Sequence, residues 1–470
     1  MIFFIPIEVK IREFFSKTFL AYHIVKKGNE VIIGGQRNIP VNISKMQNCY
    51  WLDKNLFFKK VNKKNDMRYI NNNFLGMLDE EGPISFFEKI SSEMRYPKEL
   101  INYYNTFLFW GREDLKVVNK KISNIKSKIV IGHPKYDLLK KPFIKIWDKE
   151  VNRIKNKYGK FILFNSSFRL RPSKIENRKH IITARENLKN KQKLKEALNR
   201  REKLYQIEEK NYLLTIELIK ELAFENPNRN FIYRPHPNED FDKTKLIFGS
   251  IPKNLHLVYK GEVTPWIISS DIFLHSGCTT VLEAATVRKK IICFIPFGKS
   301  HRYNMYSKIG FFFTNKKLCK NYINKIFEKK DNKLKLKYVS KIIENFDNNK
   351  FFYKKFLLHI KKIHQLKDKS KINMGKKLYS KTSIFLYRTK QKIFKILSLI
   401  KDIIILNTPL IYLLSQKYIY SKYNREKKLV SITKKEIKDI FNKIRNSENS
   451  KLKFEIKRIS QNVFKIRKAI

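Results

Sequence analysis

Cysteine is scarce in this sequence, and its few copies are scattered. The chain has four cysteines in 470 residues, Cys49, Cys278, Cys293 and Cys319, and no two of them form a CxxC pair. This spacing argues against a structural zinc site and against a disulfide framework. No cluster of metal-ligand residues stands out either, so we expect no bound metal and no other cofactor. The cysteine usage fits a reducing cytoplasm.

Long apolar runs are missing as well. The first fifteen residues, MIFFIPIEVKIREFF, meet a charge at Glu8, so we expect no leader peptide. No apolar run reaches the roughly eighteen residues that a membrane span needs. The most apolar part of the C-terminal region, Ile393–Leu414, is interrupted by charged residues, Asn407 and Pro409, so we interpret it as an amphipathic or partner-packing helix pair. We expect a cytoplasmic protein with a peripheral position on the inner face of the membrane.

Acidic residues are few beside basic ones. The chain has 42 Asp and Glu against 101 Lys and Arg, which gives a net charge of +59. Such a charge favours anionic partners, namely nucleic acid, a membrane surface or a phosphorylated substrate. Heavy use of lysine throughout the chain explains part of it without any partner. Because the sequence shows no nucleic-acid-binding motif, we expect no specific nucleic acid and favour composition together with attraction to an anionic membrane.

The chain nevertheless has enough apolar residues, 42%, to build globular cores. Residues 2–7 predict a buried strand, residues 12–27 a helix that Gly28 ends, and residues 30–33 a second strand. This order is typical of a parallel sheet with a right-handed crossover. Further strands are predicted at 74–78, 106–109 and 128–131. We therefore predict a first α/β domain over residues 1–150.

A second set of strands begins at KFILF, residues 160–164. A long helical segment without Gly or Pro follows at 177–224 and ends at Asn226-Pro227. Short strands then alternate with helices to about residue 330, which predicts a doubly wound α/β domain over 151–330. Residues 331–470 are rich in lysine and predict a helical, basic tail with a role at a membrane surface.

One stretch of the second domain suggests an anion site. In SDIFLHSGCTTVLEA a short apolar strand runs into a turn of small residues and then a helix. Such a turn leaves backbone amides uncovered, and a helix N-terminus favours negative charge. The candidate ligands are Ser276, Gly277, Cys278, Thr279 and Thr280, with Glu283 one helical turn further for the hydroxyls of a ribose. The alternative is a capping box between Thr280 and Glu283, and the two interpretations weigh evenly.

A second basic motif lies upstream, in FIYRPHP at residues 231–237. Arg234 and His236 fall on one face of a strand end, so both can reach one anion. Arginine is always charged and forms bidentate bonds with phosphate. The alternative is an Arg–carboxylate pair beside a packed histidine. We favour the phosphate-binding interpretation, because ligands in open α/β sheets bind at the carboxyl ends of strands.

Two segments of the first domain offer a general base. Asp79, Glu80 and Glu81 follow a predicted strand, and crowded carboxylates raise one another's pKa. His133 in IGHPKYDLL is a further candidate. The alternatives are a solvated acidic turn and a histidine that only caps a turn before Pro134. On the sequence alone, these structural alternatives carry more weight.

Together these motifs resemble the bacterial surface carbohydrate biosynthesis protein family. The resemblance covers residues 2–300 and rests on PIEVKIREFFSKTFLAYHIVKKGNEVIIG, LDEEG, FLFWG, IGHPKYDLL, YRPHP and GEVTPWIISSDIFLHSGCTTVLEA, which occur in the family's order. It implies a GT-B-like architecture, in which two Rossmann-like domains face a cleft and the C-terminal one holds a nucleotide-linked donor. More distantly, the layout is similar to CDP-glycerol glycerophosphotransferases and capsule Kdo transferases, although those relatives usually have serines where this chain has Cys278-Thr279-Thr280.

The resemblance also implies a function. It suggests a glycosyltransferase-like enzyme that moves a sugar or polyol-phosphate group from a nucleotide-activated donor to a glycan or glycolipid acceptor. The donor phosphates would then contact Arg234, His236 and the turn at 276–280. The catalytic candidates are Asp79, Glu80, Glu81, His133 and His236. The alternatives are a non-catalytic nucleotide-sugar-binding or scaffold protein of a glycan assembly complex and, on the net charge alone, a nucleic-acid-binding protein.

Overall fold

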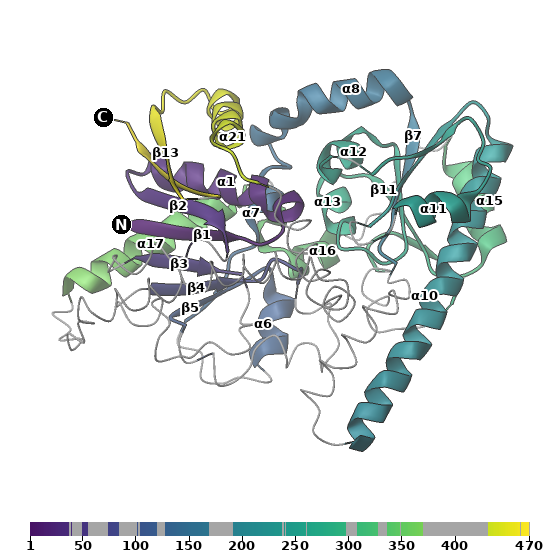
Figure 1. Ribbon diagram of the computed structural model, residues 1–470, viewed down its shortest axis with the longest axis horizontal. Helices are drawn as coiled ribbons and strands as arrows, with labels where there is room; N and C mark the ends of the chain where they lie inside the picture. Colours follow the sequence, from purple (N-terminus) through teal and green to yellow (C-terminus); the bar gives the residue numbers. More distant parts are fainter. Residues whose placement is uncertain are drawn as a thin grey trace, which may run out of the picture. The chain divides into compact units, whose positions relative to one another are not determined.

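The computed structural model describes residues 1–36, 39, 49–54, 74–83, 101, 104–119, 127–168, 191–236, 239, 241–259, 261–297, 308–327, 336–347, 349–369, 431–460 and 462–469. The chain forms two compact units (Figure 1). The first combines the described residues up to Leu138 with those after residue 348, and the second spans Leu139–Asp347. Both units are α/β, as predicted.

The first unit is built on a mixed sheet whose described strands run in the order β13-β14-β2-β1-β3-β4-β5-β6. Strands β1 to β6 are parallel, and their residues are mostly buried, as the apolar runs predicted. The elements are β1 (Ile2–Ile7), α1 (Lys10–Lys26), β2 (Glu30–Gly35), β3 (Tyr50–Asp53), β4 (Phe74–Leu78), β5 (Thr106–Phe109), α6 (Arg112–Asn119), β6 (Lys128–Val130), α7 (Pro134–Asp137), α17 (Phe352–Lys369), α21 (Lys434–Ser447), β13 (Phe454–Ser460) and β14 (Val463–Lys468). The apolar runs of the sequence predict all the parallel strands of this sheet except β3.

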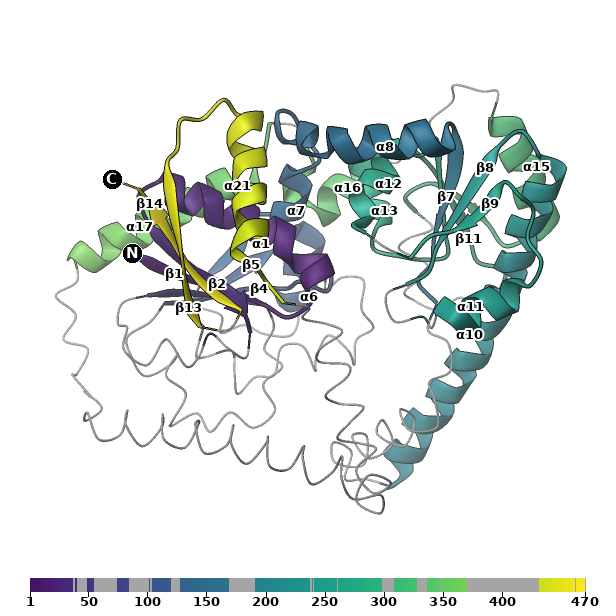
Figure 2. The same cartoon turned by 45° about the horizontal axis from the view of Figure 1, so that its top comes forward.

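The C-terminal residues correct the prediction of a helical tail. Strand β14 pairs antiparallel with β2, and β13 pairs with β14, so the chain end completes the first sheet. Figure 2 shows α21 alongside α1 and the two strands at the sheet edge. A β-carbon on Gly34 would lie 2.3 Å from the carbonyl oxygen of Asn462, so the approach of β14 requires glycine there. An open strand edge has unpaired backbone groups, and β14 pairs those of β2. The segment 393–414, predicted to be an amphipathic helix pair, lies outside the described residues.

The second unit contains a fully parallel sheet in the order β12-β11-β10-β7-β8-β9. Its elements are η2 (Phe143–Trp147), α8 (Asp148–Tyr158), β7 (Phe161–Asn165), α10 (Lys191–Glu225), β8 (Asn230–Arg234), α11 (Phe241–Phe248), β9 (Leu255–Leu257), α12 (Val263–Ser269), β10 (Ile272–His275), α13 (Val281–Thr286), β11 (Lys290–Phe294), β12 (Phe311–Phe313), α15 (Lys316–Ile326), α16 (Leu336–Ile342) and η3 (Glu344–Phe346). Counted from β7, the strand order is 3-2-1-4-5-6, the doubly wound order of dinucleotide-binding domains.

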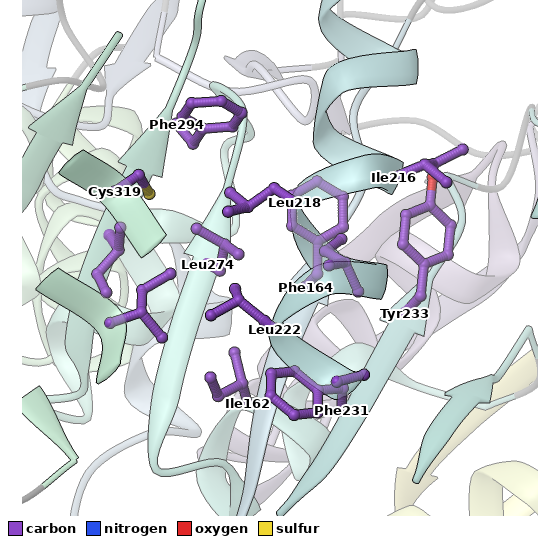
Figure 3. Close-up of a cluster of buried hydrophobic side chains, with 14 of the residues drawn as sticks. Ile162, Phe164, Ile216, Leu218, Leu222, Phe231, Tyr233, Leu274, Phe294 and Cys319 are labelled. Atoms are coloured by element: carbon purple, nitrogen blue, oxygen red, sulfur yellow. The ribbon is translucent and has the colours of Figure 1, made fainter. Parts of the chain in front are cut away.

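The core of the second unit confirms the predicted long helix over the part that is described. Leu218 and Leu222 of α10 are fully buried and pack with Ile162, Phe231 and Leu274 from three neighbouring strands (Figure 3). The C-terminal half of α10 is therefore held by the sheet, whereas the earlier half is mostly exposed. Residues 177–190 of the predicted segment lie outside the described residues.

The unit boundaries differ from the predicted domain limits of 150 and 330. The buried side chain of Lys140 donates to the carbonyl oxygens of Asn345 at 2.9 Å and Asp347 at 3.3 Å. These bonds join the two ends of the second unit, which therefore begins earlier and ends later than the composition indicated. Among the described residues, no helix is both long enough and apolar enough to cross a bilayer.

Candidate functional site

The second sheet reverses its strand order between β7 and β10, which lie side by side with Asn165 opposite His275. Their carboxyl-terminal turns therefore meet at one edge, the position where open α/β sheets bind ligands. The side-chain amide of Asn165 donates to Thr280 Oγ1 at 3.0 Å and lies 3.9 Å from Cys278 Sγ. Ser167 Oγ donates to the carbonyl oxygen of Ser276 at 3.3 Å. We call this meeting of the turns 165–167 and 276–280 the switch-point site.

His275 organises the turn of small residues. Its Nδ1 accepts hydrogen bonds from the backbone amides of Gly277 at 3.1 Å and Cys278 at 3.4 Å. The ring is fully buried, and burial lowers the pKa of His275 to about 3, so the ring is neutral at ordinary pH. Gly277 has a φ of 87°, which glycine adopts without strain. The expectation that these two amides stay uncovered for a phosphate is therefore wrong, because His275 occupies both.

Thr279 and Thr280 are the residues of this turn that keep partial exposure, whereas Ser276, Gly277 and Cys278 are buried. The Ser276 hydroxyl has no hydrogen-bond partner among the described residues. Burial raises the pKa of the Cys278 thiol, which lies 2.7 Å from Thr280 Oγ1. The threonine hydroxyls are therefore the groups of this turn best placed to meet a ligand.

The capping-box alternative is wrong. Thr280 stands at the N-cap of α13 but makes no capping bond, since its hydroxyl lies against Asn165 and Cys278. The helix predicted after this turn is confirmed as α13, which has six residues. Glu283 is 1% exposed, and its Oε2 accepts a hydrogen bond from Thr264 Oγ1 at 3.0 Å. The role of Glu283 toward a ribose remains a prediction.

Arg234 ends β8 and is almost fully buried. Its Nη2 donates to the carbonyl oxygen of Gly261 at 2.7 Å, and its guanidinium lies 5.3 Å from the centroid of the Trp266 ring. Burial lowers the pKa of Arg234 to about 10, an effect that nearby Glu262 opposes, so the side chain stays charged at neutral pH. His236 is partly exposed two residues further. Their joint contact with a phosphate remains a prediction.

Glu239 was not singled out from the sequence, although it joins the turns that follow β7 and β8. It is 4% exposed and accepts hydrogen bonds from Ser166 Oγ, from the backbone amide of His236 at 2.9 Å and from Tyr233 Oη at 3.2 Å. Burial raises its pKa to about 7, although these hydrogen bonds oppose the rise. The one available signal was an acidic residue three positions after His236.

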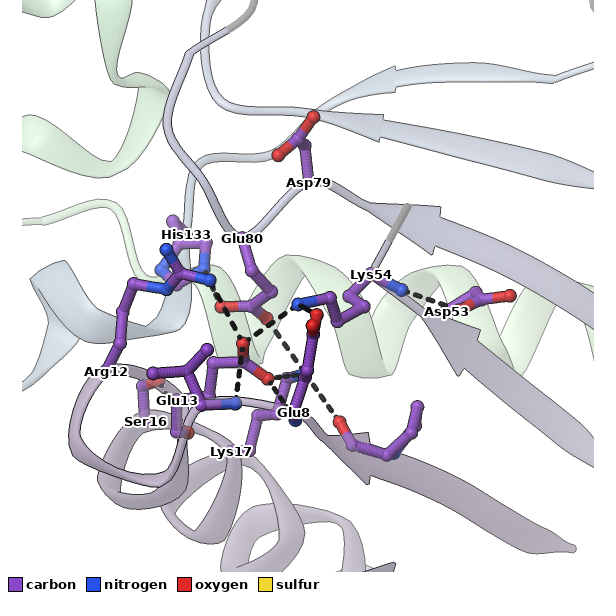
Figure 4. A network of polar contacts seen from close by, with 12 residues as sticks. Glu8, Arg12, Glu13, Ser16, Lys17, Asp53, Lys54, Asp79, Glu80 and His133 are labelled. Atoms are coloured by element: carbon purple, nitrogen blue, oxygen red, sulfur yellow. Dashed lines mark hydrogen bonds and ion pairs between the residues drawn. The ribbon is translucent and has the colours of Figure 1, made fainter. Parts of the chain in front are cut away.

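In the first unit, Glu80 points into a buried network of charges, whereas the carboxylate of Asp79 points away from it (Figure 4). Glu80 lies 3.0 Å from His133 Nε2 and 3.4 Å from Lys17 Nζ. Burial alone would raise the pKa of Glu80, but Lys17 and His133 outweigh it and lower the pKa. The expectation that crowding raises the pKa of this carboxylate is therefore wrong. Glu81 is exposed, and its amide donates to Asp79 Oδ1 at 2.8 Å.

His133 caps a helix, which was the structural alternative for this residue. Its Nδ1 accepts from the backbone amide of Lys135 at 3.3 Å at the start of α7, while Nε2 faces Glu80. Burial lowers the pKa of His133, and Glu80 opposes this only in part. Both ring nitrogens are thus engaged, which leaves neither of them to accept a proton from a substrate. A catalytic role of His133 stays a prediction, which this engagement does not favour.

The partners of Glu80 belong to a larger set that the sequence did not reveal. Glu13 of α1 is fully buried and lies 3.1 Å from both Lys17 Nζ and Lys54 Nζ. Lys54 also pairs with Glu8. Burial would raise the pKa of Glu13, but the two lysines hold it at about 2. These residues come from the first turns of α1 and from the turns after β1, β3 and β4, and the buried ones are two carboxylates, Glu13 and Glu80, and two lysines, Lys17 and Lys54.

Within the described ranges, no three His, Cys, Asp or Glu side chains gather closely enough to hold a metal ion. The polar groups at the switch-point site are instead hydroxyls and amides, and the charged Arg234 ends the neighbouring strand β8 opposite Asn165. These groups suit an oxygen-rich anion rather than a cation.

No family model matches this chain, and no curated protein does. Among solved structures it is similar to Staphylococcus aureus MnaA in complex with UDP, at 12% identity, over 78% of this chain and 96% of that one, with a TM-score of 0.46. It is similar to the Neisseria meningitidis UDP-GlcNAc 2-epimerase bound to UDP-GlcNAc, at 13% identity, over 77% and 98%, with a TM-score of 0.45. The wall teichoic acid polymerase TagF matches at 13% identity, over 78% and 90%, with a TM-score of 0.41.

By name, these structures are a protein bound to UDP, a UDP-GlcNAc 2-epimerase and a wall teichoic acid polymerase. At such identities and TM-scores, the likeness assigns no reaction, substrate or site residue to this chain.

Proposed function

We propose that this protein is a GT-B-type transferase of bacterial surface polysaccharide synthesis that uses a nucleotide-activated donor. The observation that carries the proposal is the switch-point site, where Asn165 and Thr280 meet at the carboxyl edge of a 3-2-1-4-5-6 sheet. Small polar turns at this edge suit a nucleotide phosphate. The motif resemblance supplies the class of reaction.

Catalysis in such a transfer depends on stabilising the leaving phosphate, where negative charge grows in the transition state. Arg234 is suited to this task because its guanidinium is charged and is held in place by Gly261 and Trp266. The hydroxyls of Thr279 and Thr280 add neutral donors. His236 and the buried Ser276 complete the set that we assign to the donor.

The acceptor hydroxyl must lose a proton during the transfer. Glu80 is a poor base because Lys17 and His133 stabilise its ionised form. Asp79 points away from that network and is the base that we carry forward from the three acidic residues (Figure 4). Asp79→Asn should abolish turnover and leave nucleotide binding intact.

The first test is a melting-temperature panel with CMP-, CDP-, UDP-, GDP- and dTDP-linked donors at moderate salt. A ligand that binds only the folded protein raises the melting temperature by mass action. We expect one nucleotide to raise the melting temperature of the wild type and none to raise that of Arg234→Ala or Thr280→Ala. Arg153→Ala, on the exposed face of α8, is the matched control and should respond like the wild type. Normal turnover by folded Arg234→Ala would contradict the assignment.

The engagement of His133 and Glu80 favours one alternative, a nucleotide-sugar-binding or scaffold protein without turnover. That protein would show the same response in the melting panel. It would release no nucleotide from any donor, whether or not an acceptor is present. In such a protein, Asp79→Asn would have no turnover to abolish, and this separates the two functions.

A further inference from the structure

The C-terminal part of the first unit carries a basic groove that the donor site does not use. It is lined by Lys434 and Lys438 of α21 and by Arg467 and Lys468 of β14, and it has a volume of about 510 Å³. Its remaining lining is Phe454, Glu455, Ile456 and Ala469. Glu455 is paired with Arg467 at 2.7 Å, so the excess positive charge of the groove comes from its lysines. We call these three residues, Lys434, Lys438 and Lys468, the rim of the groove.

The surrounding segment is more basic than the chain as a whole. Residues 431–470 contain twelve Lys and Arg and four Asp and Glu, a net charge of +8 in 40 residues, against +59 in 470. Lys434, Lys438 and Lys468 are all exposed. The positive charge of the rim is therefore directed to solvent.

Two of the acidic residues of this segment are turned toward α1 and contribute nothing to the rim. Glu436 pairs with Lys10 at 2.6 Å, and Glu448 pairs with Lys26 at 2.7 Å while accepting from Tyr22 Oη at 2.7 Å. The packing of Phe441 against Tyr22 and Phe454 fixes the helix in this orientation. The fold thus turns Glu436 and Glu448 toward α1 and leaves Lys434 and Lys438 at the groove.

We propose that this groove is the surface by which the protein binds the phosphate headgroups of an anionic lipid bilayer. Basic residues near an anionic surface gain from its negative potential, and their long alkyl chains tolerate the interfacial region. The apolar lining residues Phe454, Ile456 and Ala469 suit the glycerol and upper acyl part of a lipid. A nucleic acid is less suited, since the ring of Phe454 packs against Phe441 instead of forming a stacking platform. The proposal does not depend on the donor site.

The test is sedimentation of the full-length protein with vesicles of phosphatidylcholine, alone or mixed with phosphatidylglycerol. The rim variant carries Lys434→Gln, Lys438→Gln and Lys468→Gln. The matched control removes three exposed lysines of the second unit, through Lys149→Gln, Lys253→Gln and Lys325→Gln. Both variants lose the same charge, so general electrostatic attraction affects them equally.

Each lysine at an anionic surface contributes roughly a fivefold gain in affinity. We expect the rim variant to bind mixed vesicles at least about tenfold more weakly than the wild type and the control to stay within about twofold. Lys438→Glu should weaken binding in the same direction and serves if the triple variant fails to fold. Equal losses in both triple variants, or none in the rim variant, would overturn the proposal. If the rim variant lost binding to single-stranded RNA but still bound vesicles, the groove would be a nucleic-acid-binding surface instead.

Discussion

The side-chain amide of Asn165 donates a hydrogen bond to Thr280 Oγ1 across 3.0 Å, although the two residues lie 115 positions apart. This bond joins the turn after β7 to the turn after β10 at the point where the strand order reverses. It orients the threonine hydroxyl at the edge where a ligand of this sheet would lie. The proposed donor site therefore depends on Asn165, a residue that lies outside the motifs recognised in the sequence.

Replacement of Asn165 by alanine should remove this bond and the contact with Cys278. We expect a loss of stability of about 1 kcal/mol, the usual contribution of one such hydrogen bond. The rise in melting temperature with the responding nucleotide should fall to a small fraction of its wild-type value. Asn152→Ala, on the exposed face of α8, should leave both quantities unchanged. A full nucleotide response in Asn165→Ala would show that the ligand binds elsewhere.

The buried carboxyl of Glu239 should make stability depend on pH. Its folded-state pKa, raised to about 7, lies above the ordinary value of 4.5, so the folded state holds the proton more tightly than the unfolded one. The free energy of unfolding therefore falls as pH rises from about 4.5 to about 7, by about 3 kcal/mol in total, and changes no further above that range. The glutamine of Glu239→Gln cannot ionise, so the variant should not show this fall in the free energy of unfolding.

The measurement is the melting temperature of the wild type and of Glu239→Gln from pH 5 to pH 8. The melting temperature of the variant should rise relative to that of the wild type as pH increases, and the difference should stay constant above pH 7. Glutamine retains an oxygen for Ser166 and for the amide of His236, so the turns keep their geometry. Parallel curves for the two proteins would contradict a raised pKa at this position.

Lys17 should be among the residues on which the stability of the first unit depends most. It is buried between Glu13 and Glu80 and donates to the carbonyl oxygen of Pro6 at 2.6 Å. Lys17→Met would remove the buried cation that both carboxylates share, and we expect the free energy of unfolding to fall by about 3–5 kcal/mol. Lys116→Met, which breaks an exposed pair with Glu113, should change stability by no more than about 0.5 kcal/mol. Urea unfolding of the two variants tests the difference, and equal effects would contradict it.

A methyl group at position 34 should separate the C-terminal strands from the first sheet. The new β-carbon of Gly34→Ala would lie 2.8 Å from the Cα of Val463 as well as close to Asn462. We expect a loss of about 1–3 kcal/mol, as for other overpacked sites. Amide hydrogen exchange should show faster exchange at residues 463–466, whose strand pairs with β2. Unchanged protection there would mean that β14 is held by other contacts.

The sequence predicted those parts of the fold that depend on local pattern. The strands β1, β2 and β4 to β6 appear as short apolar runs, and α10 as a long segment without glycine or proline, because burial and helix propensity act over a few neighbouring residues. The C-terminal strands escaped prediction, since the lysines of β13 and β14 obscure the apolar residues between them. Their place was decided by the open edge of β2, more than 400 residues away along the chain.

By itself, the sequence determined that two α/β units exist and that basic and small polar residues stand at strand ends. Only the tertiary structure decided which of those groups remain available to a ligand. His275 takes the amides of Gly277 and Cys278, His133 and Lys17 lower the pKa of Glu80, and Glu239 joins Ser166 to a turn 73 residues away. Hydrogen bonds and burial between distant segments set these states, because a buried polar group must find a partner wherever the fold brings one near.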